Sequence, residues 1–280
     1  MNIQKAISEG QDILMNKNIK TSELDSEILM ANVIDKDRKY IILNLNEELK
    51  EEYLKKFRNL IEKRSKKEPI AYLINKKEFW NSEFFVSRHT LIPRPDTELI
   101  VDQILKITKN KNKLNILDIG IGSGCILLTI LKERSSFNGT GIDVSKNCIK
   151  ISKINAIKLK VDHRTKLFKT NVDKFNHGKY DIIVSNPPYI NKIHIKYLEK
   201  DVVNFEPKSA LYGGLDGTSE IRKVINSSSE LIKKNGKFIL EIGFDQKNKV
   251  IQLLKKKGFF INSVVKDLAK HDRCIISTKI

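Results

Sequence analysis

Cysteine and histidine are scarce in this chain, and their spacing excludes most disulfide and metal chemistry. The sequence of 280 residues holds three scattered cysteines, Cys125, Cys148 and Cys274, and none of them forms a C-x-x-C pair. The five histidines are not spaced as metal ligands either. We therefore expect neither a disulfide framework nor a zinc site, and no metal in the functional site.

Long apolar runs are also missing. No stretch approaches the roughly 20 apolar residues of a membrane-spanning helix, and the first ten residues lack the uninterrupted apolar core of a signal peptide. We expect a cytoplasmic protein without a membrane partner. The length of 280 residues and the hydrophobic content of 40% suit one large or two modest domains.

Acidic residues are outnumbered by basic ones, and the formal net charge is +18. Such an excess could form a nucleic-acid surface, because lysine and arginine neutralise phosphates. The lysines are nevertheless spread along the whole chain beside abundant asparagine and isoleucine, as A/T-rich coding would produce. Diffuse charge supports solubility and steering rather than site recognition. A functional basic face and a compositional excess are both open interpretations.

The first part of the chain has the pattern of a small helical bundle. Apolar residues recur every three to four positions up to about residue 70, most clearly in the amphipathic stretch 47–65. Thr21-Ser22-Glu23 and Asn46-Glu47-Glu48 are expected helix starts. We assign residues 1–75 to this helical domain. Residues 76–90 form an expected hairpin connector that turns at Asn81-Ser82.

From residue 91 to 280 the pattern changes to that of an α/β domain. Two prolines interrupt residues 91–98 before an expected helix at 99–109. Strands are then expected at 114–119, 140–144, 165–170, 180–185, 236–243, 259–266 and 273–280. Their alternation with helices predicts a mainly parallel sheet covered on both faces. Only six residues separate the last two strands, so these should pair antiparallel.

A glycine-rich turn, Gly120-Ile121-Gly122-Ser123-Gly124, follows the first of these strands and precedes an apolar helix. Here the backbone can approach a ligand closely, and helix N–H groups would face it. Cys125 occupies the position of the third glycine of a dinucleotide fingerprint, so the spacing favours a nucleoside-amino-acid ligand over a pyrophosphate. About twenty residues later the next strand ends at Asp143, whose carboxylate can accept from both ribose hydroxyls.

The tetrapeptide Asn186-Pro187-Pro188-Tyr189 directly follows another apolar strand. An amide-type nitrogen is a poor nucleophile because its lone pair is delocalised, so an enzyme that alkylates one must hold its N–H groups with fixed acceptors. The Asn186 carboxamide oxygen and the Pro187 carbonyl can accept these groups. The two prolines stiffen the loop, and the Tyr189 ring offers a flat wall. Right-handed crossovers would bring this loop to the same sheet edge as the glycine turn and Asp143. A simple proline turn after a strand is the alternative.

Several further stretches combine with these motifs into one pattern: 68–73, 78–80, 91–98, 117–124, 184–190, 205–207, 209–214, 267–269 and 272–273. With this set the chain resembles, from end to end, the HemK family of bacterial peptide-chain release factor glutamine methyltransferases. The tetrapeptide alone also occurs in DNA adenine methyltransferases. Residues 94–98 resemble the release-factor branch rather than the related ribosomal-protein glutamine methyltransferases.

The resemblance implies a seven-stranded, Rossmann-like, S-adenosylmethionine-dependent methyltransferase domain behind a helical domain that docks the release factor. The substrate would be the glutamine of the Gly-Gly-Gln motif in class-one release factors. No nucleic-acid substrate is expected, and a monomer is the default expectation. The residues implied to contact the cofactor are Gly120, Ile121, Gly122, Ser123, Gly124, Asp143, Asn171 and Asn186. Those implied to hold the substrate amide are Asn186, Pro187, Pro188 and Tyr189, of which Asn186, Pro187 and Tyr189 are expected to be catalytic.

Some positions depart from the family pattern or stay open. Asn171 and the two residues after it lack the aromatic that many relatives carry near adenine, and Asn75 and Lys270 replace glycines at expected turns. Asp118 either reaches the cofactor's amino group or bonds local backbone. An adenine methyltransferase acting on a flipped base and a non-catalytic RNA-binding protein are alternative functions. Residues 1–90 carry no obvious aromatic and basic recognition strip, and the intact glycine turn speaks against a non-catalytic role.

Overall fold

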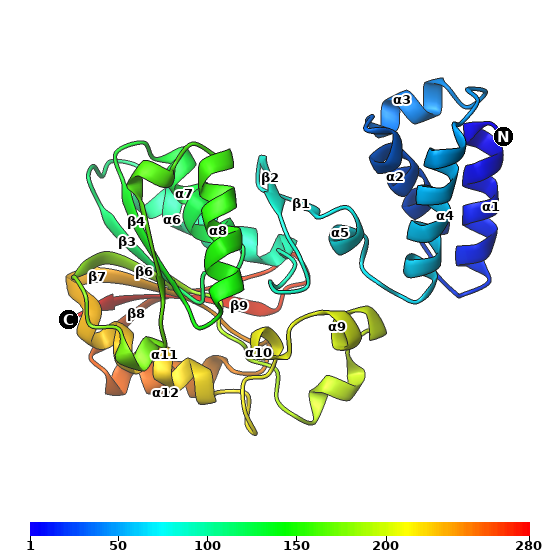
Figure 1. The fold of residues 1–280 in the computed structure, drawn as a ribbon. Helices are drawn as coiled ribbons and strands as arrows, with labels where there is room; N and C mark the ends of the chain where they lie inside the picture. The colour runs from blue at the N-terminus through cyan, green and yellow to red at the C-terminus, as the bar shows by residue number, and fades with distance from the viewer. The chain divides into compact units, whose positions relative to one another are not determined.

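The computed structural model describes all 280 residues, which divide into two compact units (Figure 1). Unit 1 consists of residues 1–76 and 199–205, and unit 2 of residues 77–198 and 206–280. None of the helices has both the length and the apolar character required to span a bilayer.

Unit 1 is helical, as its apolar spacing predicts. Its helices are α1 (Ile3–Met15), α2 (Ser22–Ile34), α3 (Arg38–Leu43), α4 (Glu51–Ser65), α5 (Ile70–Leu73) and α9 (Lys200–Phe205). Helix α2 begins at the expected position, with Thr21 as its N-cap residue. The apolar faces of α1, α2 and α4 meet in one core that includes Leu14, Leu29 and Phe57.

The expected helix start at Asn46 is wrong, because α4 begins only at Glu51. Asn46 lies in a turn instead, and residues 47–49 pair with the N-terminus. The amide of Ile3 donates to the Glu47 carbonyl over 3.0 Å, and the terminal ammonium group binds the Glu48 carboxylate at 2.7 Å. Long-range backbone pairing of this kind outweighs local helix propensity.

Unit 2 begins with a hairpin of β1 (Lys76–Phe79, whose first residue still belongs to unit 1) and β2 (Ser82–Phe85). The expected turn at Asn81-Ser82 is misplaced by one residue, since the turn is made by Trp80 and Asn81 and Ser82 already belongs to β2. Trp80 adopts a φ of 55°, which is unusual for a bulky residue. Its amide donates to Glu98 over 2.7 Å and its side chain packs on the main core, and these tertiary contacts hold the strained residue in place.

The rest of unit 2 is a seven-stranded sheet with helices on both faces. Its strands are β3 (Asn115–Ile119), β4 (Asn138–Asp143), β5 (Thr165–Lys169), β6 (Tyr180–Ser185), β7 (Ile232–Glu241), β8 (Phe259–Lys266) and β9 (Asp272–Lys279). The helices are α6 (Glu98–Ile107), α7 (Cys125–Glu133), α8 (Lys146–Lys158), α10 (Lys208–Leu211), α11 (Ser219–Leu231) and α12 (Lys247–Lys256), with short 3-10 turns at Pro95–Thr97, Asp162–Arg164, Val172–Lys174 and His194–Tyr197. All seven expected strands are present, with bounds that differ by up to four residues; β7, expected at 236–243, begins at Ile232.

The strand order is β5-β4-β3-β6-β7-β9-β8. Strands β3 to β7 run parallel, and β8 and β9 form the expected antiparallel pair, with β9 also antiparallel to β7. Because β3, β4 and β6 are parallel neighbours, the loops that follow them leave the sheet at the same carboxyl edge. The expected α/β architecture is therefore observed.

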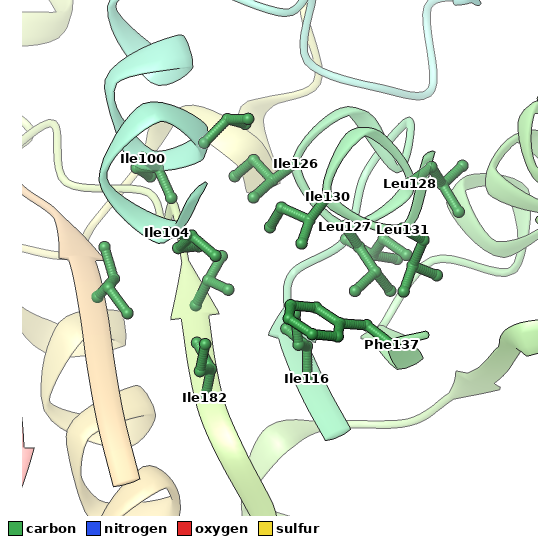
Figure 2. Packing of buried hydrophobic residues seen from close by; sticks show 14 of the residues in the cluster. Ile100, Ile104, Ile116, Ile126, Leu127, Leu128, Ile130, Leu131, Phe137 and Ile182 are labelled. Carbon is green, nitrogen blue, oxygen red and sulfur yellow. The ribbon is translucent and has the colours of Figure 1, made fainter. Parts of the chain in front are cut away.

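Successive residues of the central strands point to opposite faces of the sheet and therefore belong to two separate hydrophobic cores. Ile116 and Ile182 face α6 and α7, where Figure 2 shows them beneath Ile104, Ile130 and neighbouring side chains. Leu117 and Ile183 face the opposite way, toward the core that includes side chains from α11 and α12. Near-continuous apolar strands are required because both faces of the sheet are covered.

Candidate active site

The glycine turn leaves β3 at the carboxyl edge and is fixed by β4. The amides of Gly120 and Ile121 both donate to the carbonyl of Ile142, over 2.9 and 3.0 Å. Gly120 and Gly122 have φ angles of 79° and 56°, which favour glycine. A Cβ added at Gly120 would meet no atom within 4 Å, so the backbone there borders open space. This leaves room for a ligand to lie against the main chain.

Asp143 ends β4 beside this turn. Its carboxylate accepts from the amide of Gly122 over 3.0 Å and from the amide of Ser145 over 2.8 Å. Burial raises the pKa of Asp143 above its usual range. Each carboxylate oxygen keeps a lone pair beyond these bonds, so further donors such as a pair of vicinal hydroxyls can still be accepted.

Asp118, one residue before the end of β3, is the least satisfied polar group of the site. Its side chain is 1% exposed, and neither carboxylate oxygen has a hydrogen-bond partner. Burial raises its pKa to about 7. A buried carboxylate without a partner is costly, and a ligand carrying an ammonium group would relieve that cost.

Asn171 follows β5 and is tied to the same edge, because the amide of Thr170 donates to the Asp143 carbonyl over 2.9 Å. The Asn171 side chain is exposed, and its oxygen accepts from the amide of Asp173 at 3.2 Å in a local turn. Asn171 therefore lies close to Asp143 at the carboxyl edge of the sheet, and its side chain already accepts one local hydrogen bond.

Asn186 leaves β6 next to the glycine turn, since the preceding Ser185 pairs with Ile119 at the end of β3 and its hydroxyl donates to the Ile119 carbonyl over 2.7 Å. The Asn186 amide nitrogen donates to the hydroxyl of Thr97 over 3.2 Å. No protein group donates to the Asn186 carboxamide oxygen or to the carbonyl of Pro187. Two neighbouring acceptors are thus free.

The loop that carries these acceptors is held from beneath. The side-chain nitrogen of Gln246 donates to the carbonyls of Tyr189 and Gly217, each over 2.9 Å. Gly213 lies so close that an added Cβ would stand 2.6 Å from the Pro188 carbonyl. The hydroxyl of Tyr189 donates to Glu241 over 3.3 Å. The loop therefore has a fixed shape.

Sequence reasoning assigned no role to Thr97, Glu241 or Gln246. Glu241 ends β7 after a run of buried apolar residues and is 2% exposed. The rule that singled out Asp143, an acid at the end of an apolar strand, would have found Glu241 too. Nothing in the sequence indicates that Gln246 supports the loop, because its partners are backbone carbonyls.

A cavity of about 460 Å³ lies away from these residues, at the amino ends of β3 to β6. Arg164 is among its lining residues, and its guanidinium donates to the carbonyls of Leu131, Arg134 and Phe137 near the end of α7. This arginine serves the structure there. None of the motif residues described above lines this cavity.

The sheet, the glycine turn and the acids at the carboxyl edge define a methyltransferase fold. Residues 95–205 match the methyltransferase small domain and residues 5–74 match the PrmC N-terminal domain. A solved methyltransferase from Pyrococcus furiosus superposes with a TM-score of 0.53 at 18% identity, over 70% of this chain and 88% of that one.

The chain belongs to the release factor glutamine methyltransferase family. A relative of that name from Clostridium acetobutylicum is 36% identical, and the alignment covers 100% of this chain and 99% of the relative's length. A "bifunctional methyltransferase" from Rickettsia typhi is 35% identical over 98% of this chain. The present chain spans only 56% of that longer relative.

Proposed function

We propose that this protein transfers a methyl group from S-adenosylmethionine to the side-chain nitrogen of the glutamine in the Gly-Gly-Gln motif of class-one release factors. The observation that carries the proposal is the pair of free acceptors, the Asn186 carboxamide oxygen and the Pro187 carbonyl, on a loop with a fixed shape. A primary amide has two N–H groups, and this pair matches them. Family membership supplies the class of substrate.

The residues around the glycine turn fit the cofactor. The open backbone at Gly120 and Gly122 would take the methionine part, and the unpartnered Asp118 carboxylate would bind its ammonium group. Asp143 would accept from the ribose hydroxyls, with Asn171 near the adenine. When bound, S-adenosylmethionine supplies an electrophilic methyl group on a sulfonium centre.

The chain's own contribution to the reaction is positioning. With both N–H groups of the substrate amide donated to Asn186 and Pro187, the amide plane is fixed and the nitrogen lone pair is directed out of it toward the methyl group. With the cofactor bound, the new N–C bond would form as the S–C bond of its sulfonium group breaks. The methylated nitrogen then releases its surplus proton to water, because a protonated amide is strongly acidic. No general base is required, and the buried Glu241 is already bonded to Thr97 and Tyr189.

We assign docking of the release factor to residues 1–75, since this part of the chain matches a domain characteristic of the family and carries none of the proposed chemistry. Pro188 and Tyr189 would contact the glutamine beside the two acceptors. The cofactor would be held by residues 120–124, 143 and 171, and by Asn186 at the border with the substrate.

Transfer of a radiolabelled methyl group to purified release factor tests the proposal. Labelling of the wild-type factor and none of a factor whose Gly-Gly-Gln glutamine is replaced by alanine is the expected result. Labelling of a ribosomal protein or an oligonucleotide in place of the factor would move the activity to another substrate. Calorimetry with S-adenosylmethionine separates all of these from a non-catalytic binding protein, which would release no heat.

A further inference from the structure

Four side chains, two of them buried, form a hydrogen-bonded chain behind the substrate acceptors. The Thr97 hydroxyl donates to one carboxylate oxygen of Glu241 over 2.9 Å and accepts a hydrogen bond from the amide nitrogen of Asn186 over 3.2 Å. The other carboxylate oxygen of Glu241 accepts from the Tyr189 hydroxyl over 3.3 Å. Thr97 and Glu241 are 3% and 2% exposed, so water does not compete for these bonds.

The direction of these bonds determines how the Asn186 carboxamide is oriented. A threonine hydroxyl has one hydrogen, and here Glu241 accepts it. Thr97 therefore offers only lone pairs to Asn186, which must turn its NH2 group toward them. The carboxamide oxygen is then left free for a substrate N–H group. The opposite orientation would place two acceptors against each other at Thr97.

We propose that Thr97 and Glu241 are positioning residues that set the direction of the Asn186 carboxamide, and that adding a proton to Glu241 reverses it. The inference rests on the proposed function, in which Asn186 holds the substrate amide. With Glu241 ionised the acceptor faces the substrate. With Glu241 protonated, the Asn186 side chain turns its NH2 group toward the substrate and repels the substrate N–H groups.

The proton has one favourable place on Glu241. The Tyr189 oxygen receives a guanidinium N–H from Arg273 at 3.5 Å, so the Tyr189 hydroxyl keeps donating to its own carboxylate oxygen. A proton on the other oxygen would be donated to Thr97. The Thr97 hydroxyl would then donate to Asn186, and a rotation of the carboxamide by half a turn restores every bond.

The groups around Glu241 place this change in the working pH range. Burial raises the pKa of Glu241 to about 7, with Arg273 lowering it and Asp96 raising it. Three other titratable groups interact electrostatically with this carboxylate. They are Tyr189 in the loop after β6, Cys125 in α7 and Cys274 in β9. The pKa values of all three are raised by burial, so they stay neutral near pH 7 while Glu241 titrates.

The kinetic test compares the pH dependence of kcat in matched variants. In wild type, kcat should fall about tenfold per pH unit below pH 7, with one proton taken up. Glu241→Gln should resemble the protonated state, because its NH2 group faces Thr97. It should show a low kcat with no acidic limb. A Glu241→Gln variant with the wild-type profile would overturn the inference.

A second pair of variants addresses Thr97. Thr97→Val removes the hydroxyl at nearly constant volume and should lower kcat about 100-fold by releasing the carboxamide. Thr97→Ser keeps the hydroxyl and should retain most of the activity. Calorimetric binding of S-adenosylmethionine should be the same in both variants. Equal kcat values for Val and Ser would refute the role of the hydroxyl.

A spectroscopic readout separates this inference from the proposed function. The side-chain NH2 resonances of Asn186, assigned from their absence in Asn186→Ala, should shift with a midpoint near pH 7 in the ligand-free protein and should not shift in Glu241→Gln. If the Asn186 NH2 resonances of wild type do not shift with pH, the inference is refuted even if the release factor is methylated. A normal titration without methyl transfer to the factor would instead refute the proposed function alone.

Discussion

Asn186 combines one occupied donor with one free acceptor, and this asymmetry makes its role testable. Asn186→Ala removes the acceptor without disturbing the glycine turn or Asp143. We expect kcat for methyl transfer to fall at least about 100-fold, as when one preorganised hydrogen-bonding group is lost from an active site. The affinity for S-adenosylmethionine, measured by calorimetry, should change much less.

A matched control for this variant is Asn226→Ala, which removes an exposed asparagine from α11. It should leave both kcat and cofactor affinity unchanged. If Asn186→Ala lost cofactor binding and turnover to the same extent, Asn186 would serve the cofactor or the fold and the acceptor mechanism would be wrong.

At the residue scale, the sequence indicates groups that would touch ligands better than groups that orient them. Asn186 and Asp143 stand at strand ends in motifs with a readable spacing. Thr97 lies 89 positions from its partner Asn186 along the chain, and Gln246 lies 57 from Tyr189. Such contacts depend on how distant elements pack, so a single sequence cannot predict them.

The loop after β6 depends as an element on the support beneath it. Gln246→Glu keeps the shape of the side chain and its bond from the Gly243 amide, but removes the donors to the carbonyls of Tyr189 and Gly217. Each buried carbonyl left without a donor costs about 1 to 3 kcal/mol. We expect lower stability in urea unfolding and a loss of kcat that exceeds any change in cofactor affinity.

The neighbouring exposed residue Asp245 supplies the control, since Asp245→Asn alters the charge of the segment between β7 and α12 without touching these carbonyls. It should leave stability and kcat unchanged. Wild-type turnover in Gln246→Glu would mean that the loop keeps its shape through its prolines alone.

Helix α9 and the preceding Glu199 belong to unit 1, although the chain before and after this segment belongs to unit 2. The helix is joined to the helices of unit 1 by Arg64, which binds Asp25 at 2.7 Å and Asp201 at 2.8 Å. Arg64→Met would leave two carboxylates without their cation and should lower the free energy of unfolding by about 3 to 5 kcal/mol. Trypsin should then cleave faster at the exposed Lys200.

The control for α9 is Arg58→Met, which breaks the exposed pair of Arg58 with Glu9. An exposed pair contributes about 0 to 1 kcal/mol, so stability and trypsin cleavage should hardly change. Equal effects of the two substitutions would mean that the buried ion pairs do not retain α9.

Element prediction succeeds where periodicity carries the signal and fails where distant contacts decide. Most strands of the sheet contain an apolar run, and the sequence locates all seven to within four residues at each end. The start of α4 and the turn at Trp80 are misplaced because the N-terminus pairs with residues 47–49 and because the Trp80 amide binds Glu98. Asn75 and Lys270 do lie in turns, with φ angles of 55° and 67°.

For the whole molecule, the site residues trade stability for function. Asp118 and Glu241 are buried acids whose pKa values are raised to about 7. The folded protein therefore holds these protons more tightly than the unfolded chain. The stability they contribute is fully present below about pH 4, the ordinary range of such acids, and is lost as the pH rises through 7.

Asp118→Asn should therefore stabilise the ligand-free protein increasingly as the pH rises. The difference in free energy of unfolding between the variant and wild type should grow between pH 5 and pH 8, by up to about 3 kcal/mol, because only wild type must bury a charge. Urea unfolding across this range, with the exposed Asp162→Asn as control, measures it.

The same variant should bind S-adenosylmethionine more weakly, since an amide cannot neutralise an ammonium group. Unfolding curves that stay parallel to wild type would show that Asp118 does not carry the cost of an unpaired charge, and unchanged cofactor affinity would remove it from the proposed ammonium site.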